Sequence, residues 1–331
     1  MSAADTQQVN AIQYSRTGGP DVLQYTQVPL PAPRSGEVTV DIAAAGVNFI
    51  DIYQREGRYP MQLPAVAGSE GAGTVQAVGP DVTGVRVGDR VAWESLPGSY
   101  ADAVTGPADR LVAVPEHVEL KQAAAVPLQG FTAHYLARDS YRIQPGDTVL
   151  IHAGAGGVGL LLTQIAKILG ATVISTVSTA DKAELSSRAG ADHVIVGYQN
   201  IPGTVRDLTD GTGVAAVYDG VGQATFDDSL ASLATRGTLV LFGAASGPVA
   251  PVDPQRLNAA GSLFLTRPTL KDHVASRDEL LRRADEVFGW IADGRLTVSI
   301  GAEYPLPDAA RAQDDLAARR TTGKLLLIPE H

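Results

Sequence analysis

The stretch TVLIHAGAGGVGLLLTQIAKILG (148–170) decides the fold of this 331-residue chain. Its first six residues are typical of a strand and its last eleven of a helix, and between them Gly154, Gly156 and Gly159 form the pattern G-x-G-x-x-G. In such a unit the first glycine makes the tight turn, the second leaves room for a pyrophosphate, and the third lets helix and strand pack closely. Amide groups at the helix start then face the anion. The stretch therefore predicts a dinucleotide site.

Composition narrows the class of protein. A chain longer than about 250–300 residues usually divides into two domains. The net charge of −10 argues against nucleic acid and anionic membranes as partners, because phosphate contacts need clustered Lys and Arg. Residues 1–10 lack the features of a signal peptide, no apolar run approaches a membrane span, and the absence of cysteine excludes disulfides and thiolate zinc sites. We expect a soluble, cytoplasmic protein with no membrane association.

The pattern of strands and helices changes twice along the chain. Residues 9–127 predict short strands of a mostly antiparallel, partly closed β domain, with one short helix at 49–57. Strands and helices then alternate, with a helix expected at 222–234 and none between the strands at 193–196 and 215–220. This alternation predicts a parallel sheet with helices on both faces. After residue 267 we expect a helix at 277–294 and a second helix that follows YPLPD (304–308) and ends at Arg319. A strand at 324–329 should close the chain. The predicted fold class is α/β, with a Rossmann doubly wound domain (128–267) inserted into the β domain (1–127 plus 268–331).

The residues after the second strand of this domain favour NADPH over NADH. A Rossmann unit specific for NAD carries an acidic residue about 20 positions after the glycines, where it binds the ribose 2′-hydroxyl. Here that position is Ser178, and no acidic residue occurs between Gly159 and Asp181. A serine can donate a hydrogen bond to a 2′-phosphate, Lys182 can supply positive charge, and Tyr198 can cover the adenine–ribose edge. Alternatively, Lys182 is a solvated helix residue and Tyr198 a surface aromatic.

Nearly the whole chain resembles the zinc-free, medium-chain NADPH:quinone oxidoreductases of the zeta-crystallin-like branch, in which the β domain is GroES-like. The stretches that carry the resemblance are GGPDVLQY (18–25), GVNFIDIYQREGRYP (46–60), PLQGFTAHYL (127–136), HAGAGGVG (152–159), VYDGVG (217–222), LFGAASG (241–247), LTRPTL (265–270) and ARRTTGKLLLIP (318–329).

The resemblance implies a role for particular residues. Tyr53 and Tyr59 line the mouth of the substrate cleft and are the candidate catalytic residues. The implied cofactor contacts are Asn48 and Asp51 near the nicotinamide ribose, Gln129, Thr132 and Tyr135 on the nicotinamide side of the cleft, Gly157 and Val158 at the pyrophosphate, Ser178, Lys182, Tyr198 and Arg319 around the 2′-phosphate and adenine, Phe242, Gly243 and Ala244 along the nicotinamide half, and Leu265 and Thr266 near the carboxamide.

No metal site is expected. The resemblance implies that zinc members of the superfamily carry a Cys in the segment that here reads GVNFID and a His in the segment that reads GSEGAG. This chain has Asn48 and Ser69 at those positions. A catalytic zinc site needs three protein ligands and an open position. The six histidines show no paired spacing, and His152 is interpreted as a packing residue.

Without zinc, an acceptor that is already electrophilic is favoured, so we predict a reductase of quinones. The resemblance also implies a dimer, which would form through the edge strand SLFLTR (262–267). Tetramers and monomers remain alternatives. Two other functions stay open: reduction of α,β-unsaturated aldehydes and ketones, and NADPH binding with little turnover. Tyr53 and Tyr59 either hydrogen-bond the acceptor or form an aromatic wall. Asp51 either orients a hydroxyl group or caps the short helix.

Overall fold

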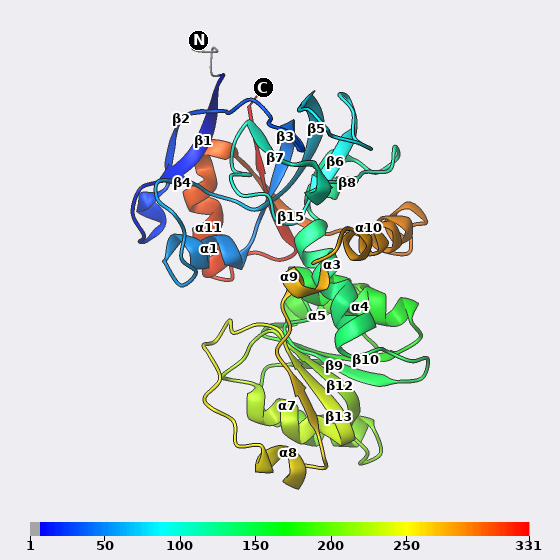
Figure 1. The fold of residues 1–331 in the computed structure, drawn as a ribbon. Helices are drawn as coiled ribbons and strands as arrows, with labels where there is room; N and C mark the ends of the chain where they lie inside the picture. Colours follow the sequence, from blue (N-terminus) through cyan, green and yellow to red (C-terminus); the bar gives the residue numbers. More distant parts are fainter. Residues whose placement is uncertain (1–6, 331) are drawn as a thin grey trace. The chain divides into compact units, whose positions relative to one another are not determined.

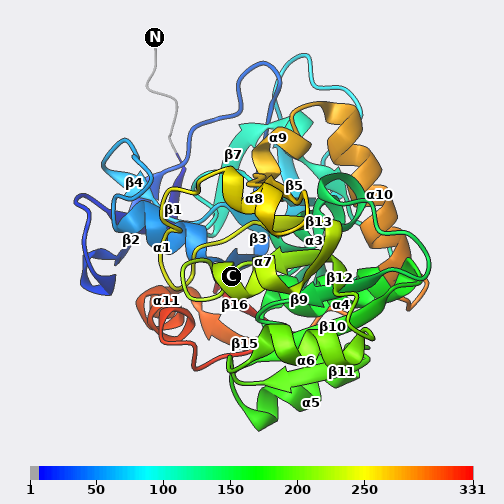
Figure 2. The same cartoon turned by 90° about the horizontal axis from the view of Figure 1, so that it is seen from below.

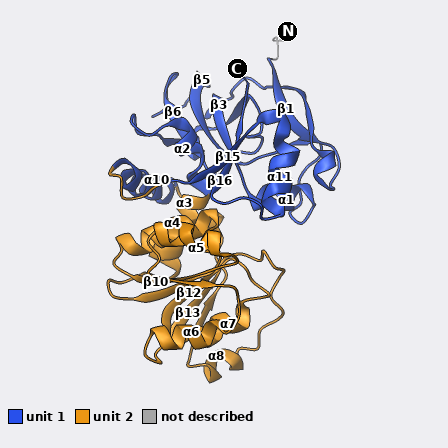
Figure 3. Ribbon diagram, turned by 180° about the vertical axis from the view of Figure 1, so that it is seen from behind, with its two compact units in different colours: residues 1–128, 277–292, 298–331 blue, residues 129–276, 293–297 orange. Residues whose placement is uncertain are grey.

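The computed structural model describes residues 7–330, which form two compact units (Figure 3). Unit 1 holds the residues up to 128 together with 277–292 and those from 298 onward, and unit 2 holds 129–276 and 293–297. Residues 268–276 and 293–297 therefore lie in unit 2, although the sequence pattern assigned them to the β domain. The Tyr135 and His273 rings stack 4.2 Å apart, and the Gln164 side chain bonds the Thr297 backbone at 2.8 and 3.0 Å. These contacts attach both segments to unit 2.

Unit 1 is built on a seven-stranded sheet in which only β15 and β16 run parallel. A second, antiparallel sheet has the order β2-β1-β4 (Figure 1). The larger sheet follows the order β15-β16-β3-β5-β6-β8, with β7 paired to β3. The strands are β1 (Gln8–Tyr14), β2 (Gln24–Pro29), β3 (Glu37–Val47), β4 (Ala65–Val66), β5 (Glu70–Val78), β6 (Arg90–Trp93), β7 (Ala103–Pro107), β8 (Val112–Ala113), β15 (Ile300–Pro305) and β16 (Lys324–Ile328).

The helices of unit 1 are α1 (Phe49–Arg55), α2 (Leu120–Ala124), α10 (Arg277–Ala292) and α11 (Ala309–Ala317). Helix α10 is amphipathic, since its buried residues Leu280, Ala284, Val287 and Phe288 recur at helical spacing. The expected helix at 49–57 ends at Arg55, and Gly57 follows in the left-handed region with φ +78°. The predicted closing strand is present as β16, whose Leu325, Leu326 and Leu327 are buried.

Unit 2 is built on a six-stranded sheet in which neighbouring strands run parallel, in the order β11-β10-β9-β12-β13-β14. Figure 2 shows the strands from β11 to β13 in this order. Helices α4 and α5 lie on one face and α6 and α7 on the other (Figures 1 and 3). This confirms the predicted fold class. The elements are α3 (Pro127–Tyr135), which belongs to unit 2 from Gln129 onward, β9 (Thr148–Ile151), α4 (Gly157–Ile168), β10 (Thr172–Val177), α5 (Ala180–Arg188), β11 (His193–Val196), α6 (Ile201–Leu208), β12 (Val214–Asp219), α7 (Phe226–Ser232), β13 (Leu233–Leu241), α8 (Gln255–Ala259), β14 (Phe264–Thr266) and α9 (Leu270–His273).

Two local features of unit 2 differ from the sequence-based expectation. Helix α6 was not predicted, because Pro202 and Gly203 are typical of a turn. Pro202 lies in the first turn of the helix, where the missing N–H removes no hydrogen bond. The helix expected at 222–234 begins only at Phe226, since the Asp219 carboxylate accepts the N–H groups of Val221 and Gly222 and holds them in a loop.

The strand order places the carboxyl ends of β9, β10, β12 and β13 along one edge of the parallel sheet. Strand β9 is flanked by β10 on one side and β12 on the other, so the chain order reverses there. Ligands of open α/β sheets bind beyond the carboxyl ends at such a reversal. The glycine pattern follows β9 directly. Within residues 7–330, no helix is long and apolar enough to cross a membrane.

Candidate functional site

The glycine loop between β9 and α4 has almost no space for side chains. A Cβ on Gly154 would collide with Ser175 Oγ, and one on Gly159 would collide with the carbonyl of Ala153 and lie 2.8 Å from the Gly154 Cα. Gly156 is the N-cap of α4 and is exposed. The loop therefore packs tightly on its inner side and presents the start of a helix, with its free N–H groups, on its outer side.

Gln129 on α3 lies against this loop. A Cβ on Gly157 would overlap the Gln129 side-chain amide. The Gln129 Oε1 atom is buried and accepts no hydrogen bond from any described residue. An orphaned acceptor is costly to bury. A polar ligand that donates a hydrogen bond beside the helix start would satisfy it, so the residues present fit a dinucleotide.

The residues expected around a 2′-phosphate follow neighbouring strands. Val177, the last residue of β10, pairs with Val196 at the end of β11, so Ser178 and Tyr198 emerge at the same edge of the sheet. Ser178 is exposed, and Tyr198 is 38% exposed. The Lys182 N–H donates to Thr179 Oγ1 at 3.4 Å, which caps the start of α5.

The expected contacts of the nicotinamide half lie at the other end of this edge. The Asp219 carbonyl accepts the N–H groups of Phe242 (2.9 Å) and Gly243 (3.3 Å), which fixes the segment after β13. The remaining expected residues of unit 2 are Ala244 in the same segment, Leu265 and Thr266 on β14, and Thr132 and Tyr135 on α3. Arg319 belongs to unit 1, where it follows α11 with a φ of +57°.

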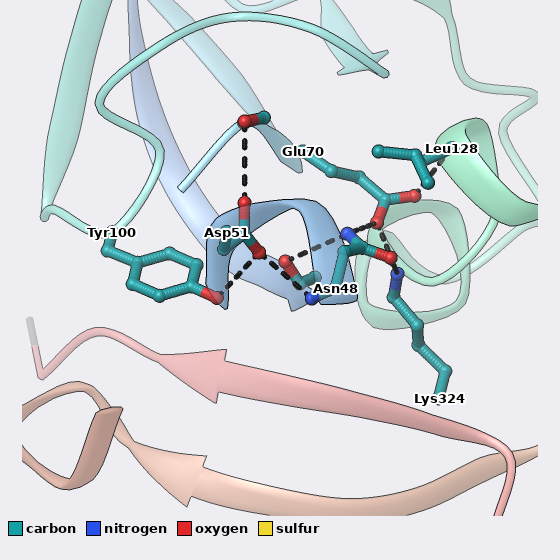
Figure 4. A network of polar contacts seen from close by, with 8 residues as sticks. Asn48, Asp51, Glu70, Tyr100, Leu128 and Lys324 are labelled. Carbon is teal, nitrogen blue, oxygen red and sulfur yellow. Dashed lines mark hydrogen bonds and ion pairs between the residues drawn. The ribbon is translucent and has the colours of Figure 1, made fainter. Parts of the chain in front are cut away.

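Unit 1 contains a buried polar cluster that joins three neighbouring strands (Figure 4). Val47 at the end of β3 pairs with Leu325 of β16, and Gly46 pairs with Glu70 of β5. Asn48, Glu70 and Lys324 therefore meet although they are far apart in sequence. Lys324 Nζ donates to Asn48 Oδ1 at 2.7 Å and pairs with the Glu70 carboxylate.

The Glu70 carboxylate accepts two further hydrogen bonds, one from Asn48 Nδ2 and one from the Leu128 N–H, both at 2.7 Å. Lys324 and Glu70 are 1% and 0% exposed. A Cβ on Gly46 would overlap both side chains, so only glycine leaves room for the pair. The ion pair is thus enclosed, and both carboxylate oxygens of Glu70 accept hydrogen bonds.

Asp51, on the first turn of α1, lies beside this cluster. Its Oδ2 accepts the Asn48 N–H at 2.9 Å and the Tyr100 hydroxyl at 2.8 Å (Figure 4). Asp51 therefore caps the helix and also accepts a hydrogen bond from a tyrosine, which is Tyr100 rather than Tyr53 or Tyr59. Its expected contact near the nicotinamide ribose stays a prediction. Burial raises the pKa of Asp51 to about 6, against the opposing effect of these hydrogen bonds.

This raised pKa gives a prediction for stability against pH. Between about pH 4 and 6 the folded state holds a proton on Asp51 that the unfolded state has released, so the free energy of unfolding falls as the pH rises. Asp51→Asn removes this titration. We expect the variant to exceed the parent in stability by about 1–3 kcal/mol at pH 7 and to lose that advantage near pH 4, as measured by chemical denaturation. A stability difference that is constant across this range would contradict the prediction.

The two candidate catalytic tyrosines belong to an aromatic cluster on and after α1. The Tyr53 ring centroid lies 6.2 Å from that of Phe49 and 6.2 Å from that of Tyr59. Tyr59 is 50% exposed, and the Arg58 guanidinium lies 5.1 Å from the Tyr53 centroid. The cluster offers flat aromatic surface, phenol groups and one cation, a combination that suits a planar, electron-poor carbonyl compound.

Sequence reasoning missed Glu70, Tyr100 and Lys324. Glu70 and Lys324 each stand at the start of a strand with mostly buried neighbours, and a charged residue there is a weak signal of a buried pair. Tyr100 carries no local signal, since its partner Asp51 is far away in sequence.

Comparison with known proteins shows the family to which the chain belongs. Residues 34–116 match the family model of the alcohol dehydrogenase GroES-like domain, and residues 157–281 match that of the zinc-binding dehydrogenases. A quinone oxidoreductase of Pseudomonas aeruginosa is 46% identical over 96% of this chain and 99% of its own length. The chain belongs to the quinone oxidoreductase family.

Solved structures agree with this membership. The quinone oxidoreductase of Escherichia coli complexed with NADPH has a TM-score of 0.93 and 41% identity, over 97% of this chain and 100% of that one. A mycobacterial protein complexed with NADPH has a TM-score of 0.94 and 55% identity, over the same shares of the two chains. The resemblance inferred from the sequence motifs is confirmed.

The zinc-binding family model raises the question of a metal, and the residues present do not fit one. Asn48 Oδ1 and the Glu70 carboxylate already bind the Lys324 ammonium, and Ser69 offers only a neutral hydroxyl. The chain contains no cysteine. Within residues 7–330, no group of three or more His, Asp or Glu side chains is arranged to hold a metal ion. Lys324 thus places a fixed cation where oxygen ligands converge.

Proposed function

We propose that this protein is an NADPH-dependent quinone reductase that works without a metal. The observation that carries the proposal is the glycine loop at the carboxyl end of β9, with the orphaned Gln129 Oε1 beside it, in a chain whose relatives include quinone oxidoreductases complexed with NADPH. NADPH, when bound, supplies the hydride. The chain would hold it through the loop, α3 and the segments after β10 and β13.

Discrimination in favour of NADPH rests on the region after β10. Ser178 is exposed at the strand end, no carboxylate precedes Asp181 there, and Lys182 lies on the first turn of α5. We expect Lys182→Ala to raise the KM for NADPH roughly tenfold and to leave the KM for NADH nearly unchanged, because only NADPH carries the 2′-phosphate charge. Steady-state kinetics with both cofactors measure this. An equal effect on the two KM values would refute the assignment.

Tyr53 and Tyr59 are the groups proposed to face the acceptor. Their phenols can hydrogen-bond a carbonyl oxygen as negative charge develops on it. We expect the double variant Tyr53→Phe, Tyr59→Phe to lower kcat for a quinone by roughly tenfold or more, with the KM for NADPH unchanged. Since phenylalanine keeps the ring, an unaltered kcat would show that the two residues form only an aromatic wall.

The reaction class is tested by comparing acceptors with NADPH as donor. We expect 1,4-benzoquinone and ortho-quinones to be turned over faster than 2-alkenals, as followed by the loss of NADPH absorbance. Faster turnover of 2-alkenals would replace the proposal by reduction of α,β-unsaturated carbonyls. Turnover of neither class, with NADPH still bound, would favour an NADPH-binding role.

We also propose a cytoplasmic homodimer with no nucleic-acid partner. Strand β14 ends the parallel sheet, and its Phe264 is 61% exposed. An exposed apolar edge strand invites pairing with a second copy. Light scattering should give the mass of two chains, and Phe264→Arg should shift it toward one; a single-chain mass for the parent would contradict the dimer.

A further inference from the structure

His152 lies at the centre of a buried hydrogen-bond chain that the proposed reaction does not use. It follows β9 directly and is 1% exposed. Its Nδ1 lies 2.9 Å from Thr176 Oγ1 on β10, and its Nε2 lies 3.0 Å from Ser229 Oγ on α7. Burial lowers the pKa of His152, which favours the neutral ring.

The partners of His152 determine which nitrogen carries the proton. Ser229 Oγ donates its hydrogen to Asp219 Oδ2 at 2.8 Å, so it must accept a hydrogen bond from His152 Nε2–H. His152 Nδ1 then accepts from the Thr176 hydroxyl. This direction also excludes a nucleophilic serine, because the Ser229 proton points to the carboxylate and the hydroxyl is fully buried.

The same chain reaches the other loops at this edge of the sheet. The Asp219 carboxylate accepts the N–H groups of Val221 at 2.8 Å and Gly222 at 2.9 Å, and its backbone carbonyl holds Phe242. His152 therefore connects the carboxyl ends of β9, β10 and β12, and through Asp219 the segment after β13. These are the segments proposed to bind the dinucleotide.

The residue after His152 is strained. Ala153 has a φ of +53°, in the left-handed region that disfavours any residue with a Cβ. Its carbonyl accepts the Gly156 N–H at 2.9 Å and abuts Gly159, so the shape of the loop depends on this turn. A strained backbone persists only where its surroundings hold it. The side chain that anchors the backbone immediately before Ala153 is His152.

We propose that His152 is a positioning residue for the dinucleotide, whose hydrogen bonds to Thr176 and Ser229 hold the strained Ala153 turn in the shape that receives the pyrophosphate. This rests on the proposed binding of NADPH. Different results would contradict the two proposals. A parent protein that binds no NADPH contradicts the proposed function, whereas a His152 variant that binds NADPH normally contradicts only the role of His152.

The test is a double-mutant cycle with glycine at position 153. His152→Phe keeps a flat ring but removes both hydrogen bonds, and we expect it to raise the Kd for NADPH on the order of tenfold, with the KM for the quinone unchanged. Ala153→Gly alone is measured as the third corner of the cycle. Combined with His152→Phe it should restore most of the affinity, because glycine adopts the turn without strain.

Controls separate this role from a general loss of structure. His193→Asn alters an exposed histidine on β11 and should leave the Kd unchanged. Titrations by NADPH fluorescence are made below the melting temperature of each variant, and His152→Asn, which keeps a polar group near Thr176, replaces His152→Phe if the latter does not fold. Unchanged affinity in the folded His152 variant, or no rescue by Ala153→Gly, would overturn the proposal.

The tautomer provides an independent check. Long-range proton–nitrogen NMR spectra of the parent should contain one histidine with a protonated Nε2 and an unprotonated Nδ1 that is missing from the His152 variant. A proton on Nδ1, or on both nitrogens at neutral pH, would contradict the hydrogen-bond chain on which the proposal depends.

Discussion

Lys324→Met should reduce the free energy of unfolding by about 3–5 kcal/mol, the largest stability loss that we expect from a single substitution in unit 1. The reason lies in the enclosure of its partner. Glu70 is fully buried and receives the Lys324 ammonium together with the N–H donors of Asn48 and Leu128. Removing the ammonium leaves a charge in the interior that solvent cannot reach, and chemical denaturation at pH 7 would measure the loss.

Two further variants distinguish the buried charge from lost packing. The double variant Glu70→Gln, Lys324→Met leaves no unpaired charge in the interior and should recover much of the stability. Lys121→Met breaks the surface pair with Glu303, in which the two side chains are 49% and 41% exposed, and should cost less than about 1 kcal/mol. If Lys324→Met were as mild as Lys121→Met, the pair would not be enclosed as described.

Gly159→Ala should weaken NADPH binding about 100-fold, which corresponds to about 2.7 kcal/mol. A Cβ at this position would strike the Ala153 carbonyl and approach the Gly154 Cα to 2.8 Å. These are backbone atoms, so the loop itself must move, and with it the N–H groups at the start of α4. Fluorescence titration with NADPH measures the Kd.

Gly289→Ala is the matched control for this substitution. Gly289 lies in α10, and a Cβ there would meet nothing within 4 Å. It should leave the Kd unchanged and slightly raise stability, because alanine is the better helix former. A Gly159→Ala variant that binds NADPH as tightly as the Gly289→Ala control would show that the loop does not hold the dinucleotide.

Local patterns in the sequence were sufficient to predict the parallel sheet and its insertion into a β domain. The strand–glycine–helix stretch at 148–170 and the alternation that follows are local signals of long, periodic elements. Helix α6 was missed because Pro202 and Gly203 are typical of a turn, and nothing in the sequence showed that the proline would fall in a first helical turn. The contacts of His273 with Tyr135, which extend unit 2 beyond residue 267, are also invisible to local patterns.

Some residues of the candidate site could likewise be predicted from the sequence, and others could not. Residues of the glycine loop could be predicted because their chemistry depends on spacing within one segment. Glu70 and Lys324 could not, because 254 positions separate them and only the register of three neighbouring strands brings them together. The role proposed for His152 likewise depends on partners from β10 and α7, so its position beside the glycines predicted no more than packing.

Whether the reaction needs a metal is decided by the rate of quinone-dependent NADPH oxidation, measured with protein dialysed against a metal chelator. Because the Lys324 ammonium, rather than a metal, is bound by the side-chain oxygens of Asn48 and Glu70, we expect full turnover of 1,4-benzoquinone after dialysis and no increase when zinc is added. Loss of turnover on dialysis that zinc restores, or no quinone-dependent oxidation of NADPH before dialysis, would contradict it.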